Sequence, residues 1–185
     1  PVNGKNIWLE CTSQKAPFGF QGDFTDDRLA LVVKHDKGEL TRTHIYKTPD
    51  NTQTCKGNYS MNENGAIRGG LVFISKGTQY DNKYMYESMP PDELIKTYRS
   101  AFSTINNIKL TQTNLKNDKD SQEFTEDIAF EAEGYGNKNG TRIIFPVNAF
   151  NQLSHVPQRY RSRVSAFEIE RGWKDTDEIV IELPQ

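Results

Sequence analysis

Two side chains that could take part in catalysis stand next to each other in the stretch IWLECTSQ, near the start of the chain. Glu10 could orient a histidine, and Cys11 could act as a thiol nucleophile if a histidine activated it. The chain has three histidines, at positions 35, 44 and 155, and no short motif ties any of them to Cys11. We therefore expect Cys11 to be a structural strand residue, because an unsupported cysteine usually serves as a small hydrophobic side chain.

Two acidic clusters offer oxygen ligands for a metal ion, NDKDSQE at 117–123 and DTDE at 175–178. A calcium loop of the EF-hand type also needs a glycine and a terminal glutamate at fixed positions, and neither cluster has this pattern. We expect solvated turns and no metal at either cluster. The sequence also shows no phosphate-binding glycine loop, serine elbow or zinc-ligand spacing. It therefore predicts no cofactor and no complete catalytic set.

Three arginines alternate in QRYRSRV, at Arg159, Arg161 and Arg163. In an extended segment they share one face, which could hold sulfate, phosphate or an acidic glycan. The alternative is that they pair across strands with an acidic face within residues 127–133. We favour this pairing, because 23 basic and 25 acidic residues leave a net charge of only −2.

Three aromatic residues, Tyr80, Tyr84 and Trp173, are candidates for a surface that stacks on a sugar or docks a peptide. Such rings combine a large apolar face with a polar tip. They suit the edge of a hydrophobic core equally well, and we favour the core. A carbohydrate-binding module would require at least one of these rings in an exposed, flat patch.

The balanced charge predicts no nucleic-acid partner, since no basic footprint is present. The longest apolar run, at residues 29–33, is far shorter than the roughly 20 residues of a membrane span, so we expect none. The two cysteines, Cys11 and Cys55, could form one disulfide or remain two thiols. Nothing in the sequence brings them together, and we favour the thiols.

Several elements must position these residues. The apolar pattern predicts strands at 6–12 and 108–110, a hairpin over 28–46, and a second hairpin whose NENG turn places Gly65 at a position that tolerates positive φ. Residues 90–105 predict a helix with one apolar stripe, and 78–89 a second helix. Alternation at 124–132, 142–147 and 179–183 predicts the last strands. The fold class is mainly β, a sandwich-like antiparallel domain with a helical insertion at about 78–105.

The order of these segments resembles the C-terminal region of exported bacterial transglutaminase-like proteins. The stretch IWLECTSQKAPFGFQGDFTDDRLALVV and the GEL turn at 38–40 resemble the end of the transglutaminase-like core. GAIRGGLVFISKGTQY, the helix and QRYRSRVS…DEIVIELP resemble the all-β domain of unknown function that follows this core. The resemblance implies that residues 1–48 are the partial C-terminal strands of the core, and that residues 49–185 are a β-sandwich accessory domain.

The resemblance also implies a function. Glu10 takes the acid position of an incomplete triad, where the family has Asp, and the family's Cys and His are expected upstream of Pro1. We expect a non-catalytic accessory or interaction domain that is not itself an enzyme and packs against the upstream transglutaminase-like core of the same protein. The alternatives are a carbohydrate- or peptide-binding module, and part of an enzyme active only with the upstream Cys and His.

A periplasmic or extracellular bacterial location follows from the same resemblance. The partners expected from it are the upstream core and a peptide or glycan. Because a core cut at residue 1 would leave sheet edges unpaired, a dimer formed by strand pairing is also compatible with the sequence.

Overall fold

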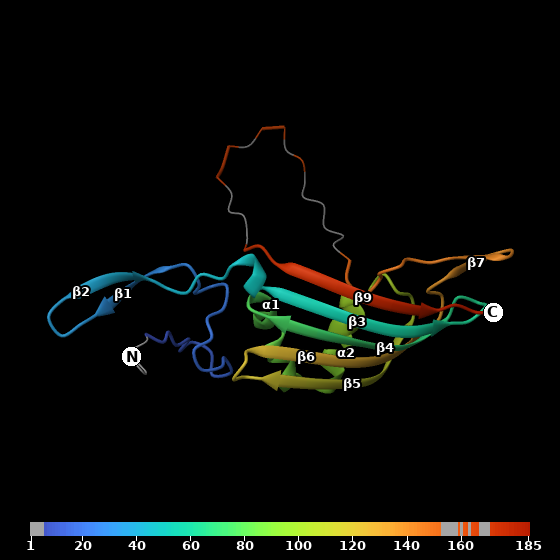
Figure 1. The fold of residues 1–185 in the computed structure, drawn as a ribbon, viewed down its shortest axis with the longest axis horizontal. Helices are drawn as coiled ribbons and strands as arrows, with labels where there is room; N and C mark the ends of the chain where they lie inside the picture. Colours follow the sequence, from blue (N-terminus) through green and yellow to red (C-terminus); the bar gives the residue numbers. More distant parts are fainter. Residues whose placement is uncertain (1–5, 153–158, 160, 163, 167–170) are drawn as a thin grey trace.

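The first strands form a hairpin that projects from one end of the molecule (Figure 1). The computed structural model describes residues 6–152, 159, 161–162, 164–166 and 171–185. Strands β1 (Leu29–Val33) and β2 (Gly38–Arg42) pair antiparallel, as the sequence predicts. A short 3₁₀ helix, η1 (Thr48–Asp50), then leads into the main sheet.

The main sheet has five strands in the order β5-β6-β4-β3-β9. Its strands are β3 (Thr52–Met61), β4 (Ile67–Lys76), β5 (Ile108–Asp118), β6 (Glu123–Ala132) and β9 (Lys174–Glu182). Three pairs are antiparallel, whereas β9 runs parallel to β3. A separate small hairpin consists of β7 (Asn137–Asn139) and β8 (Arg142–Ile144).

Three short helical elements connect β4 to β5. They are α1 (Thr78–Asp81), the 3₁₀ helix η2 (Tyr84–Ser88) and α2 (Pro91–Ala101). Helix α2 begins with Pro91, where a missing backbone N–H costs nothing, and carries Asp92 and Glu93 in its first turn. Among the described residues, no helix is both long and apolar enough to pass through a membrane.

Helix α2 lies against one face of the sheet (Figure 1). Tyr98, Phe102 and Ile105 of the predicted stripe are buried, and the Phe102 ring stacks on Phe73 of β4 with centroids 6.3 Å apart. Each buried aromatic removes a large apolar area from water, which favours this packing by about 25 cal/mol per Å². The opposite face of the sheet, which we call the open face, has mostly polar side chains in the described strands, among them exposed Lys56, Asn58 and Arg68.

Strand β5 contains a bulge between Leu110 and Gln112. Leu110 lies opposite Phe130 on the covered face, but after the bulge it is Leu115 that lies opposite Glu126 on that face. The extra residue therefore changes which alternate positions point inward. The bulge also disrupts the free edge of β5, which reduces pairing with other chains.

One carboxylate, Glu126 of β6, lies on the covered face and is fully buried. The Tyr98 hydroxyl of α2 donates a hydrogen bond to it at 2.6 Å, and Lys83 Nζ lies 3.1 Å from its Oε2. A buried charge requires such partners because its desolvation is costly. This contact ties the helical insertion to the middle of the sheet.

The prediction of a mainly β chain with a helical insertion is confirmed, since strands hold 39% of the described residues and helices 14%. The arrangement differs from two facing sheets, because α2 and its neighbouring loops cover the single large sheet. Residues 6–12 do not form the predicted strand, as none of the described strands pairs with them. Their apolar side chains Ile7 and Leu9 are exposed.

Candidate functional site

A polar depression of about 660 Å³ lies where the N-terminal residues meet the start of β9, and we call it the Trp173 depression. Three segments that are distant in sequence contribute its lining. These lining residues are Asp23, Asp26 and Arg28, then Thr78, Gln79 and Asn82, then Arg171 and Trp173. The depression therefore exists only because the fold brings these three segments together.

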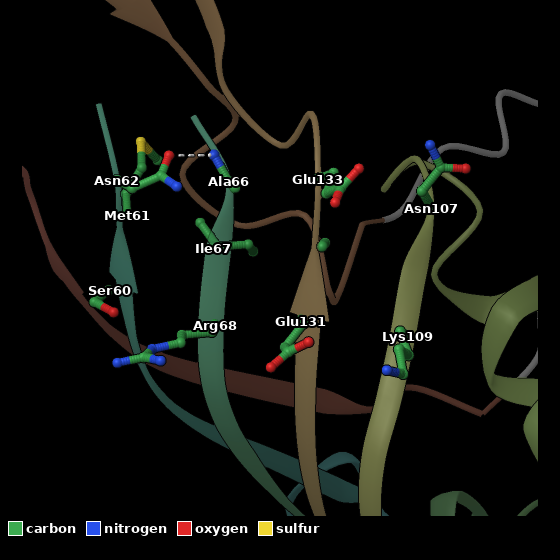
Figure 2. Close-up of a pocket in the computed structure, with 11 residues that line it drawn as sticks. Ser60, Met61, Asn62, Ala66, Ile67, Arg68, Asn107, Lys109, Glu131 and Glu133 are labelled. Atoms are coloured by element: carbon green, nitrogen blue, oxygen red, sulfur yellow. Dashed lines mark hydrogen bonds between the residues drawn. The ribbon is translucent and has the colours of Figure 1, made fainter. Parts of the chain in front are cut away.

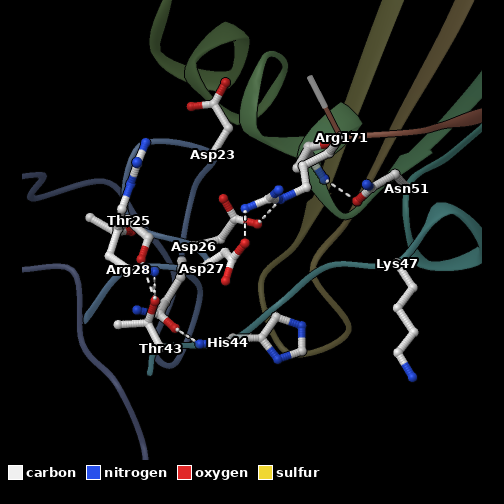
Figure 3. Close-up of polar contacts among 12 residues, drawn as sticks. Asp23, Thr25, Asp26, Asp27, Arg28, Thr43, His44, Lys47, Asn51 and Arg171 are labelled. Carbon is white, nitrogen blue, oxygen red and sulfur yellow. Dashed lines mark hydrogen bonds and ion pairs between the residues drawn. The ribbon is translucent and has the colours of Figure 1, made fainter. Parts of the chain in front are cut away.

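Arg171 joins two of these segments (Figure 3). Its Nε donates to Asp26 Oδ2 at 2.8 Å, and its Nη2 donates to Asp27 Oδ2 at 2.9 Å. Asp26 is only 2% exposed, and the Arg171 guanidinium compensates for the water that its carboxylate has lost. A hydrogen bond from Arg42 to Asp27, supported by Arg171, lowers the pKa of Asp27. We call this set of ion pairs the Arg171 clasp.

Asn51 is fully buried and joins the segment that carries Arg171 and Trp173 to the segment that begins with Thr78. Its Nδ2 donates to the carbonyl of Gly172 at 2.9 Å, and its Oδ1 accepts from the backbone N–H of Thr78 at 3.0 Å. Its own carbonyl accepts from Lys174 N–H at 2.8 Å. One side chain thus fixes the start of α1 next to the start of β9, and with them two walls of the depression.

Trp173 supplies the only aromatic ring among the lining residues of the Trp173 depression and is 41% exposed. Burial raises the pKa of the nearby Asp175, although a hydrogen bond from Asn151 opposes this effect. The Trp173 ring therefore presents an accessible face to the depression.

The other two aromatic candidates, Tyr80 and Tyr84, pack in a core as the favoured expectation had it, and do not form a flat exposed patch. Tyr80 is completely buried, donates to Asn117 Oδ1 at 2.7 Å, and packs edge-on against Phe20 at 5.0 Å. Tyr84 stacks on Tyr80 at 5.5 Å. Both belong to a second small core, built with Phe124. The core alternative is the right one for these two tyrosines.

Glu10 and Cys11 do not form a catalytic pair with a histidine in the described part of the chain. Glu10 accepts hydrogen bonds from the backbone and hydroxyl of Thr12, which lower the pKa of its carboxyl. Cys11 is exposed, and its thiol donates only a weak contact to the carbonyl of Leu9 at 3.8 Å. Within residues 6–152, no hydrogen bond joins either side chain to His35 or His44. His155 lies outside the described residues.

The two cysteines are free, so the disulfide alternative is wrong. Cys11 is exposed, whereas Cys55 is buried in β3. Burial raises the pKa of the Cys55 thiol to about 12, and the negative charges of Asp177 and Glu126 add to this effect. Cys55 is therefore held as a neutral thiol and is a poor nucleophile.

The predicted arginine stripe is only partly described. Arg159 and Arg161 are exposed and lie outside any strand, and Arg163 lies outside the described residues. The expected cross-strand pairing is wrong, because Asp127 and Glu131 lie on β6, whose two neighbours are β4 and β5. Neither arginine lines the Trp173 depression.

A second depression, of about 550 Å³, lies at one end of the open face (Figure 2). Arg68, Glu131 and Lys109 stand in register across β4, β6 and β5. Asn62 Oδ1 accepts a hydrogen bond from Ala66 N–H at 3.0 Å in the adjoining turn. No aromatic side chain is among its described lining residues, so it offers no stacking face.

The sequence interpretation singled out Trp173 but missed Arg171, Asp26 and Asn51. Trp173 attracts attention as a rare aromatic residue in a polar stretch. Arg171 stands two positions earlier, but a single arginine in a loop is usually solvated, and only the fold reveals its distant acidic partners. The pair of aspartates before an apolar strand, at 26 and 27, was the one local signal available.

In the part of the chain that the structure describes, no group of three or more His, Cys, Asp and Glu side chains is placed to hold a metal ion. The lining of the Trp173 depression combines one aromatic ring with hydroxyl, amide, carboxylate and guanidinium groups. Such a set can bind a polar ligand through stacking and hydrogen bonds.

Comparison of the chain with protein-family models, curated protein sequences and solved structures gave no match.

Proposed function

We propose that this chain is a non-catalytic interaction module that docks onto a partner through the β1–β2 hairpin. The observation that carries the proposal is the exposure of one apolar hairpin face. Leu31 lies opposite Leu40 in the register, and Leu29 and Val33 share their face. Their exposed fractions are 62% for Leu29, 64% for Leu31, 81% for Val33 and 66% for Leu40. Apolar patches of this kind typically mark interaction surfaces.

The base of the hairpin is fixed to the rest of the chain. Asp27 N–H donates to the carbonyl of His44 at 2.7 Å, and Thr43 N–H donates to the carbonyl of Arg28 at 2.8 Å. The Arg171 clasp holds Asp27 from the other side. An isolated two-stranded hairpin is only marginally stable in water, so an anchored hairpin with an uncovered apolar face suits a docking role.

The partner we propose is an upstream transglutaminase-like core of the same protein, in keeping with the order of the resembling segments. The non-catalytic role is supported by the hydrogen bonds that Glu10 makes to Thr12 instead of to a histidine. In this proposal residues 6–48 are the part of the chain that contacts the partner. The Trp173 depression lies where these residues meet α1 and the segment that precedes β9.

The proposal can be tested by thiol labelling at the hairpin. In a Cys11→Ser background, Leu31→Cys is compared in the present chain and in a longer chain that carries the upstream residues. We expect the longer chain to slow labelling of position 31 at least about tenfold, while a matched control on the open face, Asn58→Cys, labels equally in both. Equal labelling of position 31 would contradict the docking role.

The non-catalytic part has its own test. The present chain is incubated with glutamine-containing peptides and an amine donor, and turnover is followed by mass spectrometry. We expect none above the level of a Cys11→Ser variant. Turnover that requires Cys11 would show that the chain is an enzyme.

A further inference from the structure

We propose that the Trp173 depression is a binding site for an uncharged carbohydrate, with a sugar ring stacked on the exposed face of Trp173. This proposal does not rest on the docking role of the hairpin, because it uses different residues. The volume of about 660 Å³ lies within the roughly 300–1,000 Å³ range of small-ligand sites, so a short oligosaccharide fits.

The first argument is the chemical composition of the lining. A sugar ring has one apolar C–H face and a rim of hydroxyls that both donate and accept hydrogen bonds. Trp173 offers a flat apolar face, while Asn82 and Thr78 offer groups of both kinds. Neither the Asn82 amide nor the Thr78 hydroxyl has a hydrogen-bond partner among the described residues. Both groups are therefore available to a ligand.

The second argument is charge. The depression has two acidic and two basic lining residues, and Arg171 is already held by Asp26 at 2.8 Å and by Asp27 at 2.9 Å. The Asp23 carboxylate is close enough to Asp81 to raise the pKa of that group, although burial of Asp81 contributes more. A net anionic ligand would face these carboxylates, and a net cationic ligand would face Arg28. The lining thus favours a neutral, polar ligand over either ion.

The third argument separates a sugar from a peptide. Trp173 is the only aromatic or aliphatic side chain in the lining, so the depression has no pockets for apolar peptide side chains. None of the described strand edges opens into it, because its residues come from the loop before β1, from α1 and its following turn, and from the start of β9. Two recurring modes of peptide recognition, strand addition and apolar side-chain pockets, are therefore not supported by the described lining of this depression.

The fourth argument is preorganisation. The backbone on both sides of Trp173 is held by Asn51, which accepts from Lys174 N–H and donates to the Gly172 carbonyl. A segment that is already fixed loses little conformational entropy when a ligand binds to it. Arg171 acts as a positioning residue, since it holds the wall formed by residues 23–28 against the wall that carries Trp173.

The test uses the full 185-residue chain with Trp8→Phe, which leaves Trp173 as the single tryptophan. Cellotetraose, chitotetraose and maltotetraose are titrated and followed by tryptophan fluorescence and calorimetry. Tetragalacturonate and tetraalanine serve as the acidic and peptide ligands. We expect saturable binding of at least one neutral oligosaccharide, with a change in Trp173 emission, and at least about tenfold weaker binding of the acidic and peptide ligands.

Variants locate the binding. Trp173→Ala and Asn82→Ala should each weaken binding, the first at least about tenfold, and Trp173→Tyr should restore most of it because it retains a ring. Arg68→Ala, in the second depression, should leave binding unchanged. Circular dichroism checks that each variant is folded, and Trp173→Tyr and Asn82→Ala remain informative if Trp173→Ala unfolds. The proposal is overturned if no neutral oligosaccharide binds, if Trp173→Ala and Asn82→Ala bind as well as the parent, or if tetragalacturonate or tetraalanine binds more tightly.

Discussion

Arg171 donates a hydrogen bond to the buried carboxylate of Asp26 at 2.8 Å, across a separation of 145 residues in the sequence. This ion pair fixes the loop before the β1–β2 hairpin to the residues that precede β9. Two features described above depend on it, since the same contact holds the base of the exposed hairpin and one wall of the Trp173 depression.

Removal of the Arg171 side chain should destabilise the chain. Arg171→Ala leaves the Asp26 carboxylate buried without a cation, and we expect a loss of about 3 kcal/mol in the free energy of unfolding. Urea unfolding followed by circular dichroism measures this loss. Arg42→Ala serves as the control, because Arg42 is exposed and pairs with Asp27 at the surface, where about 1 kcal/mol or less is expected. Equal losses in the two variants would contradict the role assigned to Asp26.

The hydroxyl of Tyr98 should matter more than that of Tyr84. Tyr98→Phe removes the hydrogen bond to buried Glu126 and should cost about 1–3 kcal/mol in the free energy of unfolding, because the carboxylate loses a donor in a dry environment. The Tyr84 hydroxyl has no hydrogen-bond partner among the described residues, so Tyr84→Phe should change stability by less than about 0.5 kcal/mol. Urea unfolding of both variants at one pH tests this difference. Equal losses of unfolding free energy in the two variants would show that the buried Glu126 carboxylate does not need the Tyr98 hydroxyl.

The two thiols should differ sharply in reactivity. Cys11 is exposed, whereas Cys55 is buried and its pKa is raised to about 12 by burial. Iodoacetamide at neutral pH should therefore modify Cys11 in the folded protein and modify Cys55 only after unfolding. Peptide mass spectrometry with and without urea identifies the modified residue. Rapid modification of Cys55 in the folded chain would show that β3 opens readily.

Buried tyrosines should make the chain sensitive to high pH. Burial raises the pKa of Tyr46 and of Tyr80 to about 12, compared with about 10 in an unfolded chain. Burial favours the neutral form of each tyrosine in the folded chain. The contribution of each tyrosine to stability is therefore complete below about pH 10 and is lost as the pH rises from about 10 to about 12.

The free energy of unfolding should therefore fall across that interval, and Tyr80→Phe should make the fall shallower, because one of the raised groups is gone. Urea unfolding at a series of pH values measures both slopes. Identical slopes in the parent and in Tyr80→Phe would mean that Tyr80 ionises as easily in the folded chain as in the unfolded one.

Two glycines with positive φ should respond differently to alanine. Gly65 has φ +82°, and a Cβ there would lie 2.1 Å from the carbonyl oxygen of Gly136. Gly140 has φ +62°, with no atom within 4 Å of the added Cβ. Gly140→Ala should cost only the conformational strain, roughly 1–2 kcal/mol, whereas Gly65→Ala should cost more because backbone atoms must move. Thermal unfolding of both variants tests this order.

The sequence predicts well those features that local pattern determines. The NENG turn and the positive φ of Gly65 are confirmed, because two alternating strands on either side of a glycine turn specify a hairpin. Tyr98, Phe102 and Ile105 of the predicted stripe are buried, but α2 ends at Ala101, so the last two lie just beyond a helix that is shorter than predicted. Both features depend on residues close together in the chain.

Features that depend on distant partners could not be predicted in this way. The alternating pattern of β9 indicates a strand, but it does not indicate that the strand runs parallel to β3 at the edge of the sheet. Glu126 occupies an inward position of β6, and only the fold reveals Tyr98 and Lys83 as its partners. The Trp173 depression likewise needs three segments, of which the sequence analysis singled out one residue.

The parallel pairing of β3 with β9 also sets the order of events during synthesis. Strand β3 emerges from the ribosome more than a hundred residues before β9, so its outer edge is unpaired while the intervening residues are synthesised. Until Lys174–Glu182 emerges, that edge is open to pairing with other nascent chains. Translation speed over the codons between β3 and β9 should therefore affect the yield of folded protein more than translation speed over the β1–β2 hairpin.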